Sequence, residues 1–470
     1  MPHQIAYLAF TRKASSEGRE RAGVRFNLTE EELPHFRTIH SLALRELGVS
    51  ADRLMTQADY RHFAEGNGFD LESRRVFGED RPLGTMHDKC FTACELSRAM
   101  MQPLGKVCED RRLPFSDASY MQKAFNAYKR ETRKLDFTDM LEQFVERGAV
   151  PPLKLLIIDE AQDLTRLQWM VVEKIMKGVE DIVVAGDDDQ AIFEWAGADL
   201  PYFMKLTGDK FVLPRSYRLK RNIFDLSKSI VQNVRWRFEK DFSPRAEGGE
   251  VRKSIKVENE NYDEGTWYLL ARHHTFLKSY EPQLYNEGRG FINAQGKSSF
   301  DTPEVGAMLT WRSLQDGESI TRERAKLLYS KLGQGFIEPG RSRKLDVPED
   351  MALDAEELST NHGLNHLERP WSESVMMQAT QRSYLQAALK RGEDLTATPR
   401  ITISTIHGVK GGEADHVVLR PDMSRNAEKS LRANPSAESR VFYVGASRAK
   451  ESLTLVSPYV SRYYKIGERI

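Results

Sequence analysis

Residues 154–164 read KLLIIDEAQDL, an apolar run that ends abruptly on acidic and amide side chains. The apolar part is short and rich in branched residues, which is typical of a buried parallel strand. Such a strand delivers Asp159 and Glu160 to its carboxyl end, where the first carboxylate can hold Mg²⁺ and the second can accept a proton from an attacking water. Alternatively, Asp159 or Asp163 caps the following helix, and this segment alone does not separate the two interpretations.

The rest of the chain repeats this pattern of short apolar runs. Most of them lead through a polar or glycine turn into a helical pattern, such as LTRLQWMVVEKIM at 164–176. This alternation predicts an α/β fold with parallel sheets, in which functional loops gather at the carboxyl ends of the strands. The predicted strands are 5–10, 155–158, 181–186, 267–271, 401–405, 416–419 and 453–456.

The length and the net charge of the chain limit the classes of function that are possible. A chain of 470 residues suits about two to four domains. Lys plus Arg and Asp plus Glu are 69 each, so the net charge is zero and any polyanion site must be a local groove. No apolar segment is long enough to span a membrane, and MPHQIAYLAF lacks the basic region of a leader, so we expect a cytoplasmic protein.

The three cysteines, Cys90, Cys94 and Cys108, are too few for a disulfide framework. Cys90 and Cys94 lie one helical turn apart, and a metal site would need a further ligand such as His87. Buried free thiols are the simpler interpretation, because the spacing is not C-x-x-C.

A second segment, VVAGDDDQAIFEWAGAD at 183–199, strengthens the nucleotide interpretation. Another apolar strand ends there in a carboxylate cluster, and Gln190 follows as a neutral group able to orient water or sense a terminal phosphate. We expect Phe193 and Trp195 to be exposed beside this charged turn, where aromatic rings suit base stacking. Core packing is the alternative for both rings.

These two acidic segments, IIDEAQD (157–163) and GDDDQAIFEWAGAD (186–199), resemble motifs II and III of the UvrD/Rep/PcrA class of superfamily 1 DNA helicases. Other segments resemble further motifs in the family's order, and together they cover nearly the whole chain outside two polar helical stretches. These are LAFTRKASSEGRER (8–21), RTIHSLALREL (37–47), LDFTDML (135–141), LPRSYRLKRNI (213–223), WYLLARHHTFLKSYEPQLYNEGRGFI (267–292), ITISTIHGVKGGEADHVVL (401–419) and ESRVFYVGASRAKESLTLV (438–456).

The resemblance implies a P-loop NTPase helicase fold, with two RecA-like parallel-sheet domains and helical insertions. The first RecA-like domain is expected at 1–47 and 151–214, and the second at 215–315 and 397–470. A helical insertion is expected at 48–150, and a reduced one at 316–396. Both insertions are shorter than the accessory domains of the larger family members.

The resemblance also implies ATP and Mg²⁺ as ligands and assigns the residues that handle them. Asp159 would ligate Mg²⁺, Glu160 would polarise the hydrolytic water, and Gln190 would link the phosphates to DNA. Arg218 and Arg448 would reach the terminal phosphate, where a planar guanidinium stabilises spreading charge. The remaining nucleotide contacts are implied for Tyr217, which would stack on the base, and for Glu413 and Gly411.

Single-stranded DNA and its junctions with duplex are the implied partners of a monomer that moves 3′ to 5′. Phosphate contacts and stacking there bind without reading sequence. The residues expected to line the strand's path are Thr11, Lys13, His40, Phe193, Trp195, Arg272, Thr405 and His407. For an isolated histidine such as His40 or His407 a structural role is the usual one, and only the surrounding motifs favour DNA contact.

The resemblance leaves one feature unmatched, because no G-x-x-x-x-G-K-[ST] pattern occurs in residues 1–470. In GRGFINAQGKSS, Phe291 stands where glycine is required, and in LGKVCED Val107 replaces the hydroxyl residue. We therefore expect a fragment that lacks the first strand and the P-loop and is completed by an upstream polypeptide. The alternative is a DNA-binding or scaffold protein that does not hydrolyse ATP.

A smaller departure lies beside Trp195. Glu194 and Ala196 stand where the family usually has glycine and arginine, so one contact with DNA or between domains is expected to differ.

Overall fold

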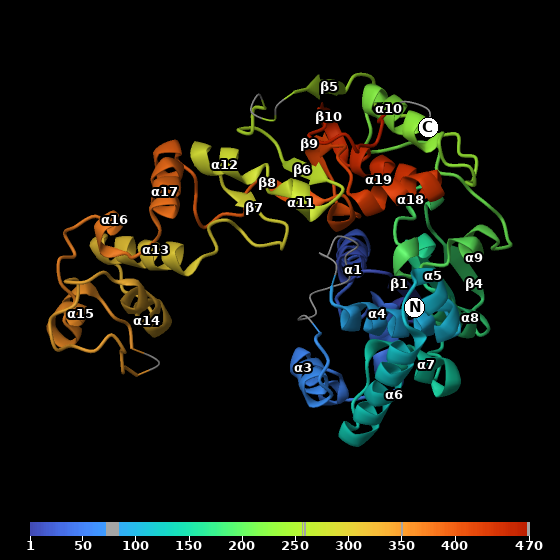
Figure 1. Ribbon diagram of the computed structural model, residues 1–470, viewed down its shortest axis with the longest axis horizontal. Helices are drawn as coiled ribbons and strands as arrows, with labels where there is room; N and C mark the ends of the chain where they lie inside the picture. The colour runs from blue at the N-terminus through green and yellow to red at the C-terminus, as the bar shows by residue number, and fades with distance from the viewer. Residues whose placement is uncertain (72–83, 256, 258–259, 349–350, 468–470) are drawn as a thin grey trace. The chain divides into compact units, whose positions relative to one another are not determined.

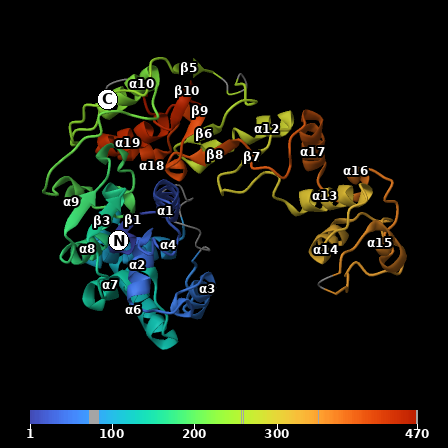
Figure 2. The same ribbon diagram turned by 180° about the vertical axis from the view of Figure 1, so that it is seen from behind.

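The computed structural model describes residues 1–71, 84–255, 257, 260–348 and 351–467. Two compact units are formed by interleaved segments (Figures 1 and 2). Unit 1 comprises Met1–Gly248, Met423–Ser447 and Arg462–Ile470, and unit 2 comprises Gly249–Asp422 and Arg448–Ser461. The limits of the predicted RecA-like domains and insertions remain predictions.

Unit 1 is built on a four-stranded parallel sheet in the order β2-β1-β3-β4. The strands are β1 (Ile5–Ala9), β2 (Phe36–Thr38), β3 (Leu155–Asp159) and β4 (Asp181–Val184). The three strands predicted from apolar runs in this part of the chain are confirmed. β2 was not predicted, because three residues are too few to show a period.

The core of unit 1 lies on one face of this sheet. Leu8, Leu156 and Ile158 are fully buried there, and Trp169 of α8 (Arg166–Met176) packs in the same cluster. Thr165 caps α8, with Gln168 completing a capping box. The interpretation of Asp159 or Asp163 as the helix cap is therefore wrong.

The other helices of unit 1 outside residues 48–150 are α1 (Arg12–Phe26), α2 (Ile39–Glu46), α9 (Leu200–Met204), α10 (Arg221–Val231), α18 (Arg425–Ala433) and α19 (Pro435–Ala446). Short 3-10 turns occur at η1 (Pro2–Gln4), η3 (Ala161–Asp163), η4 (Asp188–Gln190) and η5 (Glu194–Ala196).

The regular elements described within residues 48–150 are all helical, and residues 72–83 lie outside the described residues. Phe63, Phe91 and Phe125 form the centre of a separate core. All three cysteines are free and buried within it, and no candidate metal-ligand group among the described residues contains a cysteine. The expected burial of the three thiols is confirmed. The elements are η2 (Ala51–Arg53), α3 (Gln57–Gly66), α4 (Met86–Ala99), α5 (Leu104–Arg111), α6 (Phe115–Thr132) and α7 (Phe137–Arg147).

Unit 2 contains a six-stranded parallel sheet in the order β5-β10-β9-β6-β8-β7. The four strands predicted in this part of the chain are confirmed, whereas β5 is too polar and β7 too short to be recognised. The strands are β5 (Glu250–Ser254), β6 (Trp267–Ala271), β7 (Phe291–Ile292), β8 (Ile401–Thr405), β9 (Ala414–Arg420) and β10 (Ala449–Val456).

The helices of unit 2 include a cluster with its own core around Trp311, Tyr329 and Leu353. Its members α13, α14, α15 and α16 gather side by side in both views (Figures 1 and 2). The predicted α/β class with two parallel sheets and helical insertions is confirmed. The helices are α11 (His274–Leu277), α12 (Glu281–Glu287), α13 (Pro303–Gln315), α14 (Arg322–Lys331), α15 (Ala355–His362), α16 (Trp371–Ser374) and α17 (Ala379–Arg391), with a 3-10 turn at η7 (His407–Val409).

None of the helices in the described part of the chain combines the length and the apolar character needed to cross a membrane.

Candidate functional site

The carboxyl edge of the unit 1 sheet gathers predicted site residues from all four strands. Thr11 follows β1, His40 follows β2, Glu160 follows β3 and Gln190 follows β4. Because the four strands are parallel, their carboxyl ends lie at one edge of the sheet. Side chains far apart in sequence are therefore brought to the same edge.

The Asp159 carboxylate is held by two donors at the end of β3. Its Oδ1 accepts a hydrogen bond from the Glu160 backbone N–H at 2.9 Å, and its Oδ2 accepts one from the Tyr7 hydroxyl. Burial, together with this hydrogen bond, raises the pKa of Tyr7 above its usual range. A carboxylate has about four acceptor sites, so two remain for a cation or its waters.

Glu160 is one of the few non-glycine residues with a left-handed backbone, at φ 52° and ψ 39°. The conformation turns the chain sharply at the end of β3 and begins the η3 turn. Left-handed backbone is costly for a residue with a Cβ, and such residues often occur at functional sites.

A series of hydrogen bonds connects Glu160 with Gln190. The buried Gln162 donates from Nε2 to Glu160 Oε2 at 2.6 Å and accepts at Oε1 from the Asp187 backbone N–H at 2.9 Å. Gln190 Nε2 donates to Asp187 Oδ2 at 2.7 Å. The ends of β3 and β4 are thus joined by side chains, not only by the sheet.

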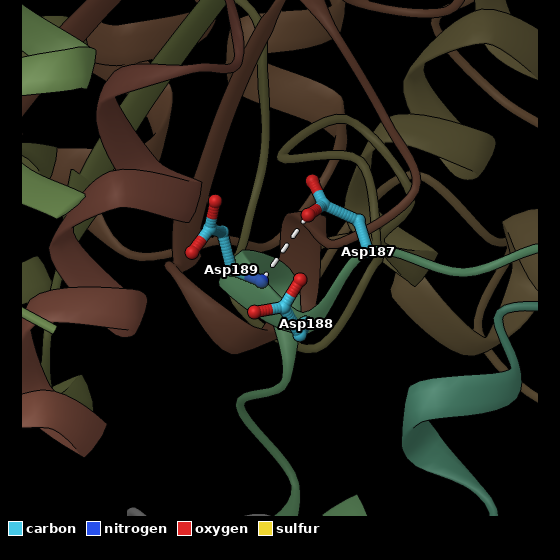
Figure 3. A group of neighbouring side chains, drawn as sticks. All are labelled: Asp187, Asp188 and Asp189. Carbon is cyan, nitrogen blue, oxygen red and sulfur yellow. Dashed lines mark hydrogen bonds between the residues drawn. The ribbon is translucent and has the colours of Figure 1, made fainter. Parts of the chain in front are cut away.

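The three consecutive aspartates after β4 form the only candidate metal-ligand group among the described residues (Figure 3). Lys240 Nζ already lies 2.5 Å from a carboxylate oxygen of Asp187, 2.5 Å from one of Asp188 and 2.8 Å from one of Asp189. Arg237 makes a bidentate pair with Asp189, at 2.8 and 2.5 Å. The Lys240 ammonium therefore occupies the position between the carboxylates where a metal ion would bind.

The pKa values of these groups follow from their burial and from the charges of Lys240 and the aspartates themselves. Burial tends to raise the pKa of Asp187, but the Lys240 ammonium and the hydrogen bonds outweigh it and the pKa is lowered. Burial dominates at Asp188, whose pKa is raised. Burial also opposes the charge of Lys240, yet the three carboxylates raise its pKa well above the usual range.

Arg440 of α19, in the segment 438–456, contacts the η4 turn that contains Asp188. Its Nε donates to the Asp188 carbonyl at 2.8 Å, and its Nη1 lies 3.3 Å from Glu194 Oε1. Burial raises the pKa of Glu194, while the Arg440 charge partly opposes that shift. Glu194, a departure from the family pattern, thus has an ion-pair partner of its own.

The predicted DNA contacts of unit 1 differ in exposure. Thr11 and Lys13 are exposed at the start of α1, where the Thr11 hydroxyl caps the helix. His40 packs edge-on against Phe137 at 5.9 Å between ring centroids. Burial lowers the pKa of His40 to about 4, so its imidazole is neutral at pH 7.

Phe193 and Trp195 are partly buried, and the expectation that they are exposed is wrong. Phe193 lies 5.8 Å from the Phe10 ring and 6.3 Å from Trp195, so three aromatic rings form a short row. Arg111 of α5 donates to the Trp195 carbonyl at 3.0 Å. The rings are held in place by neighbours while keeping some exposed surface.

Tyr217 and Arg218 lie in the segment between α9 and α10. The Tyr217 ring is 83% exposed, which suits stacking on a planar ligand. Arg218 is partly buried, and its Nη1 lies 3.4 Å from the Ser447 carbonyl.

In unit 2 one group of predicted residues lies at the carboxyl ends of β6 and β8. Arg272 follows β6 and is buried, Thr405 ends β8, and His407 begins the η7 turn. Because Ala271 pairs with Thr405 in the parallel register, these residues share one edge of the sheet. All three are predicted DNA contacts.

A second group lies at the amino ends of β9 and β10, the opposite edge of the same sheet. Arg448 is buried and donates to the Gly412 carbonyl at 3.2 Å, while its own carbonyl accepts from Ala414 N–H at 3.0 Å. Glu413 lies 3.8 Å from Lys450, and Gly411 has φ 80°. The predicted nucleotide residues of unit 2 are thus separated from its predicted DNA contacts.

Sequence reasoning did not assign Tyr7, Gln162, Lys240 or Arg440 to the site. Gln162 carries a local signal, because it lies two residues after Glu160, whereas Tyr7 is 152 residues before Asp159 and carries none. Lys240 carries none, since it reaches Asp187–Asp189 only through the fold.

Comparison with known proteins places these features in a family. A model described as the UvrD/REP helicase N-terminal domain matches residues 1–210, and one described as the UvrD-like helicase C-terminal domain matches residues 356–458. The chain belongs to the UvrD/REP helicase family. Its N-terminal match contains the whole Glu160-to-Gln190 series.

Curated relatives of this UvrD/REP-family chain share low identity with it. ATP-dependent DNA helicase Rep of Buchnera aphidicola subsp. Baizongia pistaciae is 22% identical over 55% of this chain and 40% of its own length. The protein of the same name from Escherichia coli is 25% identical over 57% of this chain and 42% of its own. ATP-dependent DNA helicase PcrA of Leuconostoc citreum is 23% identical over 58% of this chain and 37% of its own. The chain thus spans about two fifths of the length of these relatives.

Among solved structures, an arterivirus helicase, nonstructural protein 10, is similar over 67% of this chain and 41% of its own, with 10% identity and a TM-score of 0.28. This similarity is too low to support any argument.

Proposed function

We propose that the chain is the motor part of an ATP-dependent DNA helicase or translocase, which moves 3′ to 5′ along single-stranded DNA in replication, repair or recombination. The hydrogen-bonded series Glu160, Gln162, Asp187 and Gln190 carries this proposal. It places a carboxylate base and a neutral amide at the carboxyl edge of a parallel sheet, in a chain of the UvrD/REP helicase family.

The proposed reaction is hydrolysis of the terminal phosphate of ATP. Gln162 fixes one oxygen of Glu160, and the other oxygen accepts the proton of the attacking water. Asp159 offers its remaining acceptor sites to Mg²⁺, which when bound neutralises phosphate charge. The Asp187–Asp189 cluster does not serve as the Mg²⁺ site, because Lys240 occupies it.

The remaining nucleotide roles are proposals from the family pattern. The exposed Tyr217 ring stacks on the base, and Glu413 and Gly411 contact the sugar and phosphates. Arg218 and Arg448 stabilise the charge that develops on the phosphate oxygens. Convergence of Glu160 and Arg448 on one nucleotide remains part of the proposal.

Single-stranded DNA is proposed to contact the exposed start of α1, the row of aromatic rings and the carboxyl edge of the unit 2 sheet. The contacts are Thr11, Lys13, His40, Phe193 and Trp195 in unit 1, and Arg272, Thr405 and His407 in unit 2. Such contacts bind phosphates and bases without reading sequence. We propose that the protein acts as a cytoplasmic monomer.

The test of hydrolysis is an ATPase assay with and without single-stranded DNA. It is performed on the chain alone and with an added polypeptide that carries a strand, a G-x-x-x-x-G-K-[ST] loop and a helix. We expect DNA-stimulated turnover in the completed protein, and we expect Glu160→Gln to lower kcat at least about 100-fold. Glu146→Gln, which removes the same charge at an exposed position of α7, is the matched control.

The alternative is a DNA-binding protein that does not hydrolyse ATP. The lack of a G-x-x-x-x-G-K-[ST] pattern in residues 1–470 favours it. Tight binding of single-stranded DNA without turnover, even in the completed protein, would support this alternative and contradict the motor.

The DNA path is tested by fluorescence anisotropy with oligo(dT) at several salt concentrations. Lys13→Ala should weaken binding and reduce the slope of log K against log salt by about 0.7, because one phosphate contact is lost. Lys177→Ala removes an exposed charge at the end of α8 and should leave the slope unchanged. Equal effects of the two substitutions would contradict the proposed path.

A further inference from the structure

Lys240 reaches the turn after β4 from a part of the chain that lies 53 residues beyond Asp187. Its Nζ contacts a carboxylate oxygen of each of the three aspartates, and the Lys240 side chain is only 14% exposed. Asp188 and Asp189 are buried carboxylates, and compensation of their charge accounts for these two contacts. Asp187 differs from them, because its second oxygen is used by another side chain.

The two carboxylate oxygens of Asp187 have different partners. Oδ1 accepts a hydrogen bond from the Asp189 backbone N–H at 3.1 Å (Figure 3) and also lies 2.5 Å from Lys240 Nζ. Oδ2 accepts from Gln190 Nε2 at 2.7 Å. Because an ionised carboxylate only accepts hydrogen bonds, the nitrogen end of the Gln190 amide must face Asp187 and the carbonyl end must face elsewhere.

The charge on Asp187 depends on a cation nearby. The ligand atoms of the three aspartates all lie within 4.8 Å of one another, and like charges at such distances favour protonation of one of them. The Lys240 ammonium opposes this effect and lowers the pKa of Asp187. A protonated Asp187 would be a donor, and the Gln190 amide would then turn its carbonyl toward that carboxyl group.

The segment that carries Lys240 is also held by contacts of its own. Phe238 N–H donates to Asp188 Oδ2 at 2.9 Å, and the Trp236 carbonyl accepts from Arg440 Nη2 at 2.9 Å. These bonds do not involve the ammonium group. The segment is therefore expected to stay in place when the ammonium is removed, so that the effect of removal falls on the carboxylates.

We propose that Lys240 is a positioning residue for Gln190. By pairing with one oxygen of Asp187, it keeps the other oxygen as an acceptor for the Gln190 amide and so holds that amide in one orientation. The consequence for hydrolysis rests on the proposed function, in which the Gln190 amide orients water. The fixed orientation of the amide does not rest on it.

Gln162 provides an internal reference for this proposal. Its Oε1 accepts from the Asp187 backbone N–H at 2.9 Å, and its Nε2 donates to Glu160 Oε2 at 2.6 Å. Neither bond involves the Asp187 carboxylate. Loss of the Lys240 ammonium should therefore change the amide of Gln190 and leave that of Gln162 unchanged, whereas a general loosening of the turn would change both.

The experiment uses residues 1–470 with ¹⁵N-labelled glutamine and measures the exchange of side-chain amide protons with water by NMR. Gln162→Leu and Gln190→Leu identify the two signals. Lys240→Met should accelerate exchange at Gln190 at least about tenfold, because a hydrogen bond to a charged acceptor is weakened. Unchanged exchange at Gln190, or equal acceleration at Gln162, would overturn the proposal.

Arg237→Met is the matched control, because it removes a cation from the same segment. The two hydrogen bonds of Arg237 both go to Asp189, at 2.8 and 2.5 Å, and not to Asp187. Arg237→Met should lower stability but change the exchange at Gln190 less than about twofold. If it accelerates this exchange as much as Lys240→Met does, any lost cation has the same effect and the specific role of Lys240 is contradicted.

A double substitution separates positioning from compensation of charge. Asp188→Asn added to Lys240→Met removes one of the crowded negative charges, so it should raise the unfolding midpoint above that of Lys240→Met. Exchange at Gln190 should stay fast, because the ammonium partner of Asp187 is still missing. Recovery of slow exchange together with stability would overturn the proposal. If Lys240→Met does not fold, the double variant still decides.

Turnover separates this proposal from the proposed function. If the chain hydrolyses ATP, Lys240→Met should lower kcat at least about tenfold and change KM for ATP less than about twofold, because a misoriented Gln190 affects the hydrolytic step. Hydrolysis that depends on Glu160 but not on Lys240 would contradict the positioning role. Fast exchange at Gln190 in Lys240→Met without any hydrolysis by the wild type would contradict the proposed function and support the positioning of Gln190.

Discussion

At the residue scale, Glu160 combines a proposed chemical role with an unusual backbone conformation. Its carboxylate is the proposed base, and its backbone is left-handed at φ 52°. The hydrogen bond from Gln162 orients the side chain, while the backbone conformation turns the chain toward η3. Local strain and the position of a reactive group are therefore set by one residue.

The strain at Glu160 predicts an unusual order of stability between two variants. Glu160→Ala and Glu160→Gly lose the same hydrogen bond, but only alanine keeps a Cβ in the left-handed region. The glycine variant should be more stable by about 1 kcal/mol in urea unfolding, the reverse of the order in a helix. An alanine variant as stable as the glycine variant would show that position 160 is not left-handed.

His40 predicts a dependence of stability on pH. Burial lowers its pKa to about 4 in the folded chain, against about 6.5 when unfolded. The unfolded state then binds more protons between these values, so this stability is present above pH 6.5 and is lost as pH falls toward 4. His40→Gln should reduce the fall in Tm between pH 7.5 and pH 5, by about 2–4 °C for each kcal/mol removed.

The control for this measurement is His62→Gln, which changes an exposed histidine of unit 1. The wild type and the control should lose the same Tm between the two pH values. An unchanged fall in His40→Gln would mean that its imidazole does not control the titration.

At the scale of elements, the start of α7 is held by a charge cluster from three helices. Asp136 is buried, caps α7, and lies 2.7 Å from Arg98 and 2.6 Å from Lys129. Burial tends to raise the pKa of Asp136, but the two cations outweigh it and the pKa is lowered. The helices of residues 48–150 are thus joined by charge as well as by their apolar core.

Removing one charge from this cluster should lower the stability of the folded chain. Asp136→Asn removes the most buried carboxylate from Arg98 and Lys129, which keep only the more exposed Asp139 and Glu142, and should lower the free energy of unfolding by about 3 kcal/mol. Glu142 also pairs with Arg98, but the Glu142 side chain is 40% exposed. Glu142→Gln should therefore lower the free energy of unfolding by less than about 1 kcal/mol. Urea unfolding with hydrogen exchange in α4, α6 and α7 measures both, and equal costs would contradict a buried cluster.

The strands show what can be predicted at this scale. The seven apolar runs became strands because their periodicity and branched residues are local properties. β2, β5 and β7 were missed because they are short or polar and owe their conformation to neighbouring strands. The exposure of β4 was also unpredictable, since its sequence is that of a buried strand.

At the scale of the whole molecule, the chain forms two compact units with separate cores. Trp169 is fully buried in the core of unit 1, and Trp311 is fully buried in the helical core of unit 2. Each core has its own contiguous set of apolar contacts. The two units are therefore expected to unfold as separate cooperative transitions.

Substitution of each tryptophan tests this separation. Trp169→Ala should destabilise the transition of unit 1, and Trp311→Ala that of unit 2, each by about 3–5 kcal/mol. Scanning calorimetry of both variants measures the shifts. A common shift of one transition by either substitution would show that the two units unfold together.

The sequence by itself determined the strand and helix segments, the parallel α/β class and the placement of Asp159, Glu160 and Gln190 after strands. These follow from periodicity and from the rule that parallel strands end at one edge. Only the tertiary structure decided that Lys240 contacts all three aspartates and that β4 exposes apolar side chains. These depend on contacts between residues distant in sequence, which no local pattern encodes.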